Sequence, residues 1–468
     1  MTNRAISRLS VLFVALFLLL AVRQAYVMIV RAPDIAAHAS NPRHGLLDAH
    51  RGRILATDGT VLAQTTGGKR VYPFGPSLAH TVGYASARYG TSGLEDAYDR
   101  ALTPAESGGD PVAQLRSIGD AFAGKADFAR GADVVTTIVP SVQKTLYARL
   151  SRYPRAAGVV LDPRTGAVLA ISSVPSFDPN EIDARFASLT TSAGSPLLDR
   201  SIDGLYPPGS TFKIFTASAA LDSGSVAASD TFDDPGYLQV GTFTLHNDED
   251  ETTGTADVTR AFALSSNVDF AQIALKMGVG TFYDYLHRWG IGASMDFQIP
   301  ASRDRVPEQS TIVDGELAQM GFGQGALLMT PLQMALIGAT IADGGTEQRP
   351  YLVRQLVRSG TVSSVYAGAA LATPITADTA STVKKMMVAV VQYGTGTAAR
   401  LPGVTVAGKT GTATNPLGRS HSWFVCFAPA ENPRVAVAVV VENVGYGATY
   451  ALPIARDVLA SALAAVPQ

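Results

Sequence analysis

The longest hydrophobic run in the chain lies at its N-terminus. Residues 9–22 carry no charged side chain, and the apolar character continues past Arg23 as far as Val30. An α-helix needs about 20 apolar residues to cross a bilayer, and an arginine near the interface can extend its guanidinium group into water. The pattern therefore predicts a transmembrane helix over residues 9–30, preceded by a short tail over residues 1–8.

A cleaved signal peptide is the alternative explanation for this run. A small-residue motif, Ala-His-Ala, is present at residues 37–39, but it lies too far beyond the apolar segment for ordinary cleavage. The prediction is therefore an uncleaved anchor. Its orientation stays open at this point, because two arginines before the run are matched by two that follow it.

The segment after the anchor predicts a small separate module. The stretch "RGRILATDGTVLA" alternates apolar and polar residues around Asp58-Gly59, which is typical of a β-hairpin with a tight turn. Glycine-rich breaks follow at "ESGGD" and "RGAD", and no obvious catalytic cluster is present. We therefore interpret residues 31–139 as a pedestal or docking module.

From residue 140 the hydrophobic pattern changes to that of a larger α+β domain. A helical period is followed by two apolar strands around a "DPRTG" turn and then by a predominantly helical region. Three strand-like runs follow, "VTVAGKTGTAT", "SWFVCFAP" and "RVAVAVVVENV", and a helix over residues 454–465 closes the chain. Strands at both ends predict one mainly antiparallel sheet, completed by distant segments, with helices packed on it. This domain is expected to span residues 140–468.

The composition limits the kinds of function. A chain of 468 residues, 47% hydrophobic and 16% charged, is large enough for one catalytic domain and a smaller one. The net charge of −2 and the absence of a long basic run argue against nucleic acid as a partner. The single cysteine, Cys426, excludes an internal disulfide and a cysteine-rich metal site, and its apolar surroundings favour a core position. No metal site and no cofactor are predicted.

The stretch "LYPPGSTFKIF" contains a candidate catalytic serine. Two prolines and a glycine precede Ser210 and would turn the chain sharply into a helix. Lys213, three residues further on, would share a face of that helix with Ser210, among apolar neighbours. The same residues would also fit a purely structural role, with a serine that caps the helix and a lysine that reaches into solvent. This stretch alone therefore does not establish a catalytic site.

Two further stretches strengthen the catalytic interpretation. "LSSNVDF" places a serine and an asparagine two apart at a break before a helix, and "AGKTGTA" places a lysine on a predicted strand. At spacings of about 55 and about 145 residues, they complete the Ser-x-x-Lys, Ser-x-Asn, Lys-Thr-Gly set of acyl-serine enzymes. The predicted catalytic residues are Ser210, Lys213 and Ser265, and the predicted substrate-binding residues are Asn267, Lys409, Thr410, Gly411 and Thr412.

The chemistry of acyl transfer explains the catalytic residue types. A serine hydroxyl is a poor nucleophile until a base takes its proton, and no histidine lies near a motif. Lys213 can be that base if burial and the charge of Lys409 lower its pKa. Ser265 can relay a proton between Lys213 and the leaving amine.

The remaining predicted residues would hold the substrate. Asn267 can bind the substrate amide, Thr410 and Thr412 offer hydroxyl groups to a substrate carboxylate, and Gly411 lets the substrate backbone approach the strand. The backbone N–H groups of Ser210 and Thr412 form the expected oxyanion hole, in which one donor contributes about 3–4 kcal/mol in comparable enzymes.

In these motifs the chain resembles the class B penicillin-binding proteins, which are membrane-anchored peptidoglycan D,D-transpeptidases. The resemblance covers nearly the whole chain, because "RGRILATDGTVLA", "YGTSGLEDAYDRAL", "LYPPGSTFK", "LSSNV", "GFGQGALLMTPLQMA", "VAGKTGTA" and "HSWFVCFAPAENP" occur in the family's order. The short region before the catalytic domain is similar to that of the smaller actinobacterial penicillin-binding protein A group. Cys426, Asp343 and a short loop before "HSWF" depart from the family pattern without touching the proposed chemistry.

The resemblance implies the rest of the expected function. The fold would be the penicillin-binding transpeptidase fold, with helices on both faces of its sheet. The catalytic domain would lie on the outer face of the cell membrane and residues 1–8 in the cytoplasm. The substrates would be peptidoglycan stem peptides ending in D-Ala-D-Ala, β-lactams would acylate the serine, and a SEDS-family glycan polymerase would be the partner.

Three other functions are compatible with some of these residues. A D,D-carboxypeptidase needs no further residue, because water replaces the acceptor amine. A serine β-lactamase shares the three motifs but uses a water held by a glutamate, usually in a Glu-x-x-Leu-Asn loop that is not found after Asn267. A β-lactam sensor usually carries further membrane helices and a cytoplasmic signalling domain, whereas about eight residues precede the predicted anchor here.

Overall fold

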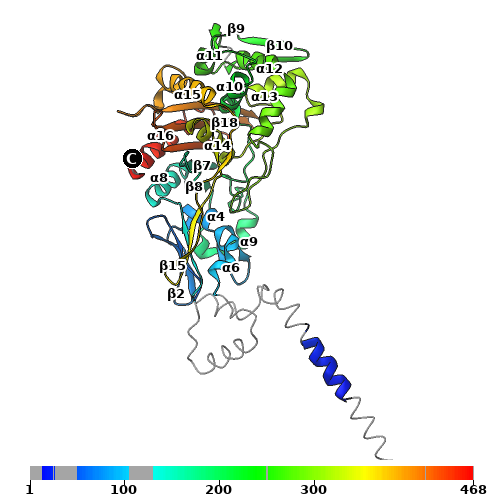
Figure 1. Ribbon diagram of the computed structural model, residues 1–468, viewed down its shortest axis with the longest axis vertical. Coiled ribbons are helices and arrows are strands. Elements are labelled where there is room, and N and C mark those ends of the chain that lie inside the picture. Colours follow the sequence, from blue (N-terminus) through cyan, green and yellow to red (C-terminus); the bar gives the residue numbers. More distant parts are fainter. Residues whose placement is uncertain are drawn as a thin grey trace, which may run out of the picture.

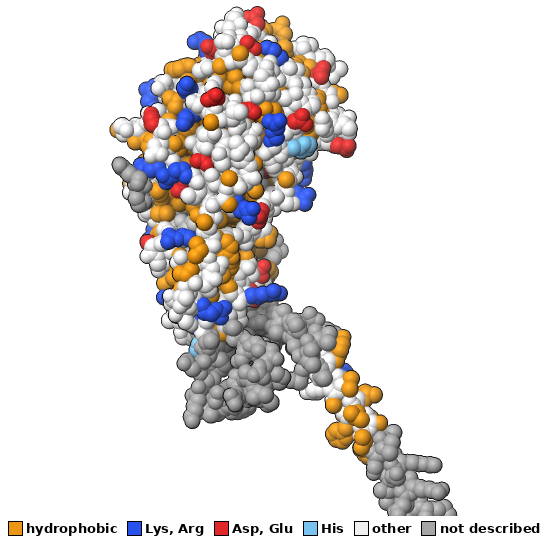
Figure 2. All heavy atoms as spheres, viewed as in Figure 1, with side chains coloured by type: hydrophobic (Ala, Val, Ile, Leu, Met, Phe, Trp, Pro, Cys, Tyr) orange, Lys and Arg blue, Asp and Glu red, His pale blue; other side chains and the backbone are white. Residues whose placement is uncertain are grey.

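The computed structural model describes residues 13–24, 26, 50–104, 130–248, 251–416 and 418–466. They form an elongated molecule, with a smaller sheet at one end and a larger mixed portion at the other (Figure 1). Residues 13–24 are helical, and hydrophobic side chains cover this helix (Figure 2). The predicted tail over residues 1–8, most of the rest of the predicted anchor over residues 9–30, and residues 31–49 and 105–129 of the predicted pedestal lie outside the described residues. In the described residues, no helix is both long enough and apolar enough to cross a membrane.

The N-terminal sheet combines strands from both halves of the chain. Its strand order is β15–β14–β6–β1–β2–β3, and the strands are β1 (Ile54–Leu55), β2 (Val61–Thr66), β3 (Lys69–Val71), β6 (Asp133–Thr136), β14 (Val353–Arg358) and β15 (Thr361–Val365). β1 and β2 form the predicted hairpin around Asp58-Gly59, where Gly59 has a φ of 85° that glycine adopts without strain. β14 pairs antiparallel with β6, so a segment far downstream completes the sheet of the first module.

Short helices follow β3 and surround a buried charge cluster. They are η1 (Gly75–Leu78), α4 (Ala79–Val82), α5 (Gly93–Ala97) and α6 (Asp99–Leu102), with the two-residue strands β4 (Ala85–Ser86) and β5 (Gly90–Thr91) between them. The Glu95 carboxylate has an exposed fraction of 0% and accepts hydrogen bonds of 2.7 Å from Nε of Arg51 and from Nε of Arg70. Each guanidinium group thus compensates part of a charge that would be costly to bury alone.

A second sheet forms the centre of the larger portion. Its strands, in the order β17–β18–β19–β7–β8, are β17 (Ala407–Asn415), β18 (Gly418–Ala428), β19 (Val435–Val441), β7 (Ala156–Leu161) and β8 (Val168–Val174). All neighbouring pairs are antiparallel, and every residue of β7, β8 and β19 is buried. The structure thus confirms one antiparallel sheet that distant segments of the chain complete.

Helices cover both faces of this sheet. They include α8 (Pro140–Leu150), α14 (Pro331–Ala342) and α16 (Ala451–Ala465). α8 and α16 share a core with Cys426 and Val437, whereas α14 packs on the other face with Val425 and Ala438. Neighbouring residues of one strand thus enter different cores, as expected for a sheet that is buried on both sides. Cys426 is a fully buried core residue, as the sequence predicts.

The remaining elements lie between β8 and β17 in the sequence. They are η2 (Pro179–Glu181), α9 (Ile182–Thr190), η3 (Gly209–Phe212), α10 (Lys213–Asp222), β9 (Thr231–Asp234), β10 (Tyr237–Val240), β11 (Phe243–His246), β12 (Gly254–Asp257), α11 (Val258–Leu264), α12 (Asn267–Arg288), η5 (Gln309–Thr311), α13 (Asp314–Gly321), β13 (Glu347–Gln348), β16 (Ala370–Ala372), α15 (Ala377–Gln392) and η6 (Thr397–Ala399). β9 pairs with β12 and β10 with β11, at the end of the molecule far from the N-terminal sheet (Figure 1). The sequence pattern predicted a predominantly helical region here and missed these strands, which are four residues long and largely exposed.

Candidate active site

Ser210 lies in a tight turn that leads into a buried helix. The turn is the 3₁₀ helix η3, and α10 begins directly after it with Lys213. Gly209 has a φ of 54°, and a Cβ atom there would lie 2.7 Å from the carbonyl oxygen of Thr412. Glycine alone fits both this conformation and this space. The turn therefore brings Ser210, which is 7% exposed, next to the strand that carries Thr412.

Two long-range hydrogen bonds hold this turn. The indole Nε1 of the fully buried Trp423, on β18, donates to the carbonyl oxygen of Pro207 at 3.0 Å. The backbone N–H of Gly209 donates to the carbonyl oxygen of Gly323 at 2.9 Å. The serine turn is thus fixed from the central sheet on one side and from the "GFGQG" segment on the other.

Lys213 is fully buried and bonded to the second motif. Its Nζ donates to the carbonyl oxygen of Ser265 at 2.6 Å and to Oδ1 of Asn267 at 2.8 Å, and it lies 3.4 Å from Oγ of Ser265. Burial lowers the pKa of Lys213 to about 7, because the ammonium group has lost its water. Near neutral pH a large fraction of Lys213 is therefore the unprotonated amine that a general base must be.

A second buried lysine contacts the same serine. Nζ of Lys409 donates to Oγ of Ser265 at 2.8 Å and to the carbonyl oxygen of Thr410 at 3.1 Å. The pKa of Lys409 is lowered mainly by burial and, to a lesser extent, by the positive charge of Lys213. Both lysines have an exposed fraction of 0%. Since both amino groups reach Ser265, their mutual repulsion disfavours the state in which both are protonated.

The backbone of the second motif is shaped to hold these lysines. Ser265 ends α11 with a left-handed φ of 67°, a conformation that costs a non-glycine residue about 1 kcal/mol or more, and Asn267 begins α12. This bend directs the carbonyl oxygen of Ser265 to Lys213 and its hydroxyl group to Lys409. Nδ2 of Asn267 donates to the carbonyl oxygen of His246 at 3.1 Å, which leaves its second N–H for a ligand.

The third motif lies on β17, the outermost strand of the central sheet. A Cβ atom at Gly411 would lie 2.8 Å from Cγ2 of Thr211 and 3.1 Å from the carbonyl oxygen of Pro208. Glycine is therefore needed here for close packing of the strand against the serine turn. From the sequence we expect this glycine for a different reason, the approach of a substrate backbone, and the packing adds to that reason.

The two threonines of this motif differ in their surroundings. The hydroxyl oxygen of Thr410 lies 2.5 Å from that of Thr395, so it is engaged inside the protein. Thr412 is more exposed, and its hydroxyl oxygen accepts a long bond of 3.4 Å from the N–H of Gly447. Thr412 is thus the better placed of the two to bind a ligand.

Two family models match the chain. The penicillin binding protein transpeptidase domain matches residues 156–460, and the penicillin binding protein A dimerisation domain matches residues 51–134. The chain belongs to the penicillin-binding protein transpeptidase family. The resemblance that the motifs indicate is therefore confirmed.

Named relatives and solved structures of the family agree with this assignment. The chain is 35% identical to peptidoglycan D,D-transpeptidase PbpA of Mycolicibacterium smegmatis, over 98% of this chain and 99% of the relative. It is 33% identical to the PbpA protein of Mycobacterium tuberculosis, over 99% of this chain and 100% of the relative. The structure of penicillin-binding protein A from M. tuberculosis, as a ceftriaxone acyl-enzyme complex, has a TM-score of 0.81 and 31% identity, and the match covers 90% of this chain and 100% of that one. The D,D-transpeptidase domain of a peptidoglycan glycosyltransferase from Eggerthella lenta has a TM-score of 0.80 and 33% identity, with 89% and 99% covered.

All the predicted site residues of this penicillin-binding protein lie in one region. Hydrogen bonds join Lys213, Ser265, Asn267 and Lys409, and the serine turn packs closely against Thr412 at Gly209. Residues outside the three motifs complete the site. Trp423 and Gly323 hold the serine turn, and Asn247 caps the start of α12 by accepting the N–H of Asn267 at 2.7 Å.

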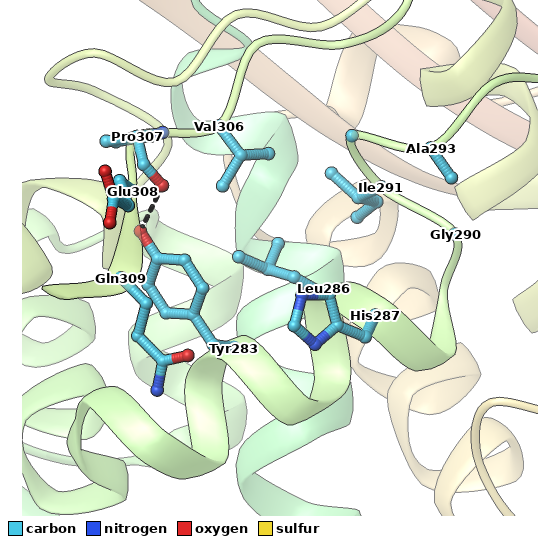
Figure 3. Close-up of a pocket in the computed structure, with 11 residues that line it drawn as sticks. Tyr283, Leu286, His287, Gly290, Ile291, Ala293, Val306, Pro307, Glu308 and Gln309 are labelled. Carbon is cyan, nitrogen blue, oxygen red and sulfur yellow. Dashed lines mark hydrogen bonds between the residues drawn. The ribbon is translucent and has the colours of Figure 1, made fainter.

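A cavity of about 390 Å³ lies in the same portion of the penicillin-binding protein, at the C-terminal end of α12 (Figure 3). Tyr283 and His287 of α12 face Val306 and Glu308 across it, and the Tyr283 hydroxyl donates to the carbonyl oxygen of Pro307 at 2.8 Å. None of the predicted site residues lines this cavity. Its place at the end of α12 opposite Asn267 separates it from the serine.

Proposed function

We propose that this protein is a membrane-anchored peptidoglycan D,D-transpeptidase that works through an acyl-enzyme on Ser210. One observation carries the proposal: two fully buried lysines, Lys213 and Lys409, meet at the hydroxyl group of Ser265 beside the turn that carries Ser210. Such an arrangement supplies a neutral amine as base and a hydroxyl group as proton relay. The family, and the D,D-transpeptidase activity after which the PbpA relative is named, support the same assignment.

Acylation begins with proton transfer from Ser210. The neutral Lys213 amine takes the hydroxyl proton, and the serine oxygen attacks the carbonyl carbon of the penultimate D-Ala. The negative charge that develops on the carbonyl oxygen is stabilised by the backbone N–H groups of Ser210 and Thr412, at about 3–4 kcal/mol per donor. The close approach of Gly209 to Thr412 supports this pairing of donors.

Collapse of the tetrahedral intermediate releases the terminal D-Ala. Its C–N bond breaks, and the nitrogen receives a proton from Lys213 through the Ser265 hydroxyl, whose oxygen lies 3.4 Å from Nζ of Lys213. The product is an ester between Ser210 and the shortened stem peptide. An amine of a second stem peptide then attacks this ester by the same steps in reverse, which forms the cross-link and restores the serine.

The other predicted residues position the donor peptide. β17 is the outermost strand of its sheet, so an extended peptide can lie along it. The free N–H of the Asn267 side chain can bind the peptide carbonyl, and the Thr412 hydroxyl and the Lys409 charge favour the terminal carboxylate. A β-lactam has the same acyl group and carboxylate, and it would enter the site in the same way.

The acyl-enzyme gives a direct test. Intact mass spectrometry of a protein that starts near Ala32, mixed with penicillin, should show one added drug mass that persists for many minutes. Ser210→Ala should show none. A lasting ester is expected because the ring fragment stays attached where an acceptor would approach, and because the sequence has no Glu-x-x-Leu-Asn motif after Asn267 to hold a hydrolytic water. Rapid drug turnover would instead indicate a β-lactamase, and no adduct in the folded wild type would contradict the assignment of Ser210.

Product analysis separates transpeptidation from D,D-carboxypeptidation. The purified protein is given lipid-linked peptidoglycan together with a glycan polymerase, for which we propose a SEDS-family enzyme. Cross-linked dimers are expected, because an amine acceptor can approach the ester beside β17, the outermost strand of its sheet. Shortened stem peptides without dimers would overturn the transpeptidase assignment in favour of the carboxypeptidase.

The anchor places this chemistry at the outer face of the cell membrane. We propose that residues 9–30 cross the membrane, as the length of the apolar run supports. The family to which the chain belongs favours the orientation with residues 1–8 in the cytoplasm. The full chain should then fractionate with membranes, and a chain that starts near Ala32 should be soluble. A mature N-terminus near Ser40 would contradict an uncleaved anchor.

A further inference from the structure

The Ser-x-Asn turn rests on a buried carboxylate network that the three motifs do not include. Asp234, on β9, is 1% exposed and accepts hydrogen bonds from the side chains of Asn247, Thr253 and Ser266 at 2.7–2.9 Å. Burial alone would raise the pKa of Asp234, but the backbone N–H of Gly236 together with these side-chain donors favours the charged carboxylate and lowers that pKa. Ser266 itself stands between the two motif residues, so this network is in direct contact with the catalytic turn.

A second carboxyl group, that of Asp269, lies in the same network. Asp269 is in the first turn of α12, two residues after Asn267, and its exposed fraction is 0%. Its Oδ2 lies 3.1 Å from the hydroxyl oxygen of Thr253, whereas its Oδ1 has no hydrogen-bond partner among the residues that the structure describes. Burial raises the pKa of Asp269 to about 6, because an ionised carboxylate is poorly solvated there.

The Thr253 hydroxyl group has a single proton, and this limits which of the two carboxyl groups it can donate to. The Thr253 hydroxyl lies within 2.8 Å of Asp234 and 3.1 Å of Asp269, but it has one proton and can donate it to only one of them. If Asp269 is protonated, its O–H can donate to Thr253 while Thr253 donates to Asp234. If Asp269 is ionised, two carboxylates compete for one donor. One additional proton, on Asp269, therefore removes the competition of the two carboxyl groups for the Thr253 donor.

The charge of Asp269 acts on the catalytic base. Lys213 is bonded to Asn267, in the same helical turn as Asp269, and negative charges on Asp248, Asp269 and Asp234 each favour its protonated form. Lys409, facing from β17, is the other charged group at this position and repels Lys213. Asp234 is held charged by its donors, whereas the pKa of Asp269 is raised to about 6, so Asp269 changes its charge closer to neutral pH than Asp234 does.

We propose that Asp269 is a positioning residue for acyl transfer: its buried carboxyl group, linked to Asp234 through Thr253, sets the proton affinity of Lys213 and so the pH range in which Ser210 is acylated. This inference rests on the proposed function of Ser210 and Lys213. Above about pH 6, where Asp269 is mostly ionised, its charge favours the protonated form of Lys213 and so keeps part of the base inactive. Removing that charge should release the base at lower pH.

The test is the pH profile of Ser210 acylation in Asp269→Asn. Acylation rates of wild type and variant with a fluorescent penicillin are measured from pH 5 to pH 9, each relative to its own plateau, with the adduct confirmed by mass spectrometry. The acid limb of the variant should move down by about one pH unit, which is the lower end of what one neighbouring charge does to a buried group. Asp233→Asn removes an exposed carboxylate from the same strand as Asp234 and should leave the limb in place.

The outcomes separate this inference from the function on which it rests. A limb that stays in place in a folded Asp269→Asn protein overturns the inference while the Ser210 assignment stands. Asp269→Ala provides a second variant without a new amide, and it must move the limb in the same direction. If the wild type forms no Ser210 adduct at any pH, the proposed function fails and this inference fails with it.

Discussion

Replacing each buried lysine with arginine tests which of the two is the base. A guanidinium group stays protonated at every pH at which proteins fold, so Lys213→Arg keeps a donor but cannot accept the Ser210 proton. Lys213 donates to Ser265 and Asn267 at 2.6 and 2.8 Å, and an arginine can still donate to both. The expected loss is therefore that of a general base, about 10²–10⁴-fold in the acylation rate constant.

Lys409→Arg should behave differently, because the contacts of Lys409 require only a positively charged hydrogen-bond donor. Nζ of Lys409 donates to the Ser265 hydroxyl and to the Thr410 carbonyl oxygen, and a guanidinium group can serve both. Both lysines have an exposed fraction of 0%, so the larger guanidinium group costs stability in either variant, by about 1–3 kcal/mol. We expect Lys409→Arg to acylate within about tenfold of wild type, a factor that corresponds to about 1.4 kcal/mol in the barrier.

The assay is stopped-flow acylation by a fluorescent penicillin at several drug concentrations, which separates binding from the chemical step. Thermal unfolding of each variant reports the shared packing cost, so the two arginine variants are matched controls for each other. Equal losses in the chemical step, or a Lys213→Arg protein that acylates like wild type, would refute the assignment of Lys213 as the base.

Three further predictions use other parts of the molecule. The wild-type acylation rate should rise with pH through about pH 7, because Lys213 must lose its proton and its pKa is lowered to about 7; a rate that falls over that range in a pH series would contradict this role. Trp423→Phe removes the donor to Pro207 and should slow acylation up to about tenfold, the effect of one hydrogen bond, and an unchanged rate would mean that the serine turn needs no such support. Glu95→Gln leaves Arg51 and Arg70 without their shared counter-charge and should lower the free energy of unfolding by about 3–5 kcal/mol in denaturant titrations, whereas acylation by the folded variant should not change.

The sequence predicted the reacting groups because their chemistry needs particular residue types at fixed local spacings. Ser210 and Lys213 share one turn, and Ser265 and Asn267 share one bend, so a short motif contains each pair. Runs of buried apolar residues likewise predicted the central strands, since a sheet covered on both faces has few polar positions to obscure the pattern.

The sequence did not predict the parts that depend on distant contacts. Trp423 supports Pro207 across more than 200 positions of the chain, and nothing near either residue indicates this pairing. β14 and β15 join the N-terminal sheet from residues 353–365, where most side chains are partly or fully exposed and the apolar pattern is weak. Asp234 ends the short strand β9 and Thr253 directly precedes the short strand β12, and their role is visible only once Ser266 and Asp269 are placed beside them.

The left-handed backbone at Ser265 raises the question of why this position is a serine and not a glycine. Glycine would adopt its φ of 67° without strain, but it would leave Lys409 with the Thr410 carbonyl oxygen as its one remaining acceptor. The serine costs about 1 kcal/mol or more in backbone energy, whereas the loss of one hydrogen bond from a buried charged donor costs about 1.5–3 kcal/mol. The strained backbone is therefore a consequence of bringing two amino groups to one hydroxyl group, and the network behind it, from Asn247 to Asp234, holds the bend in place.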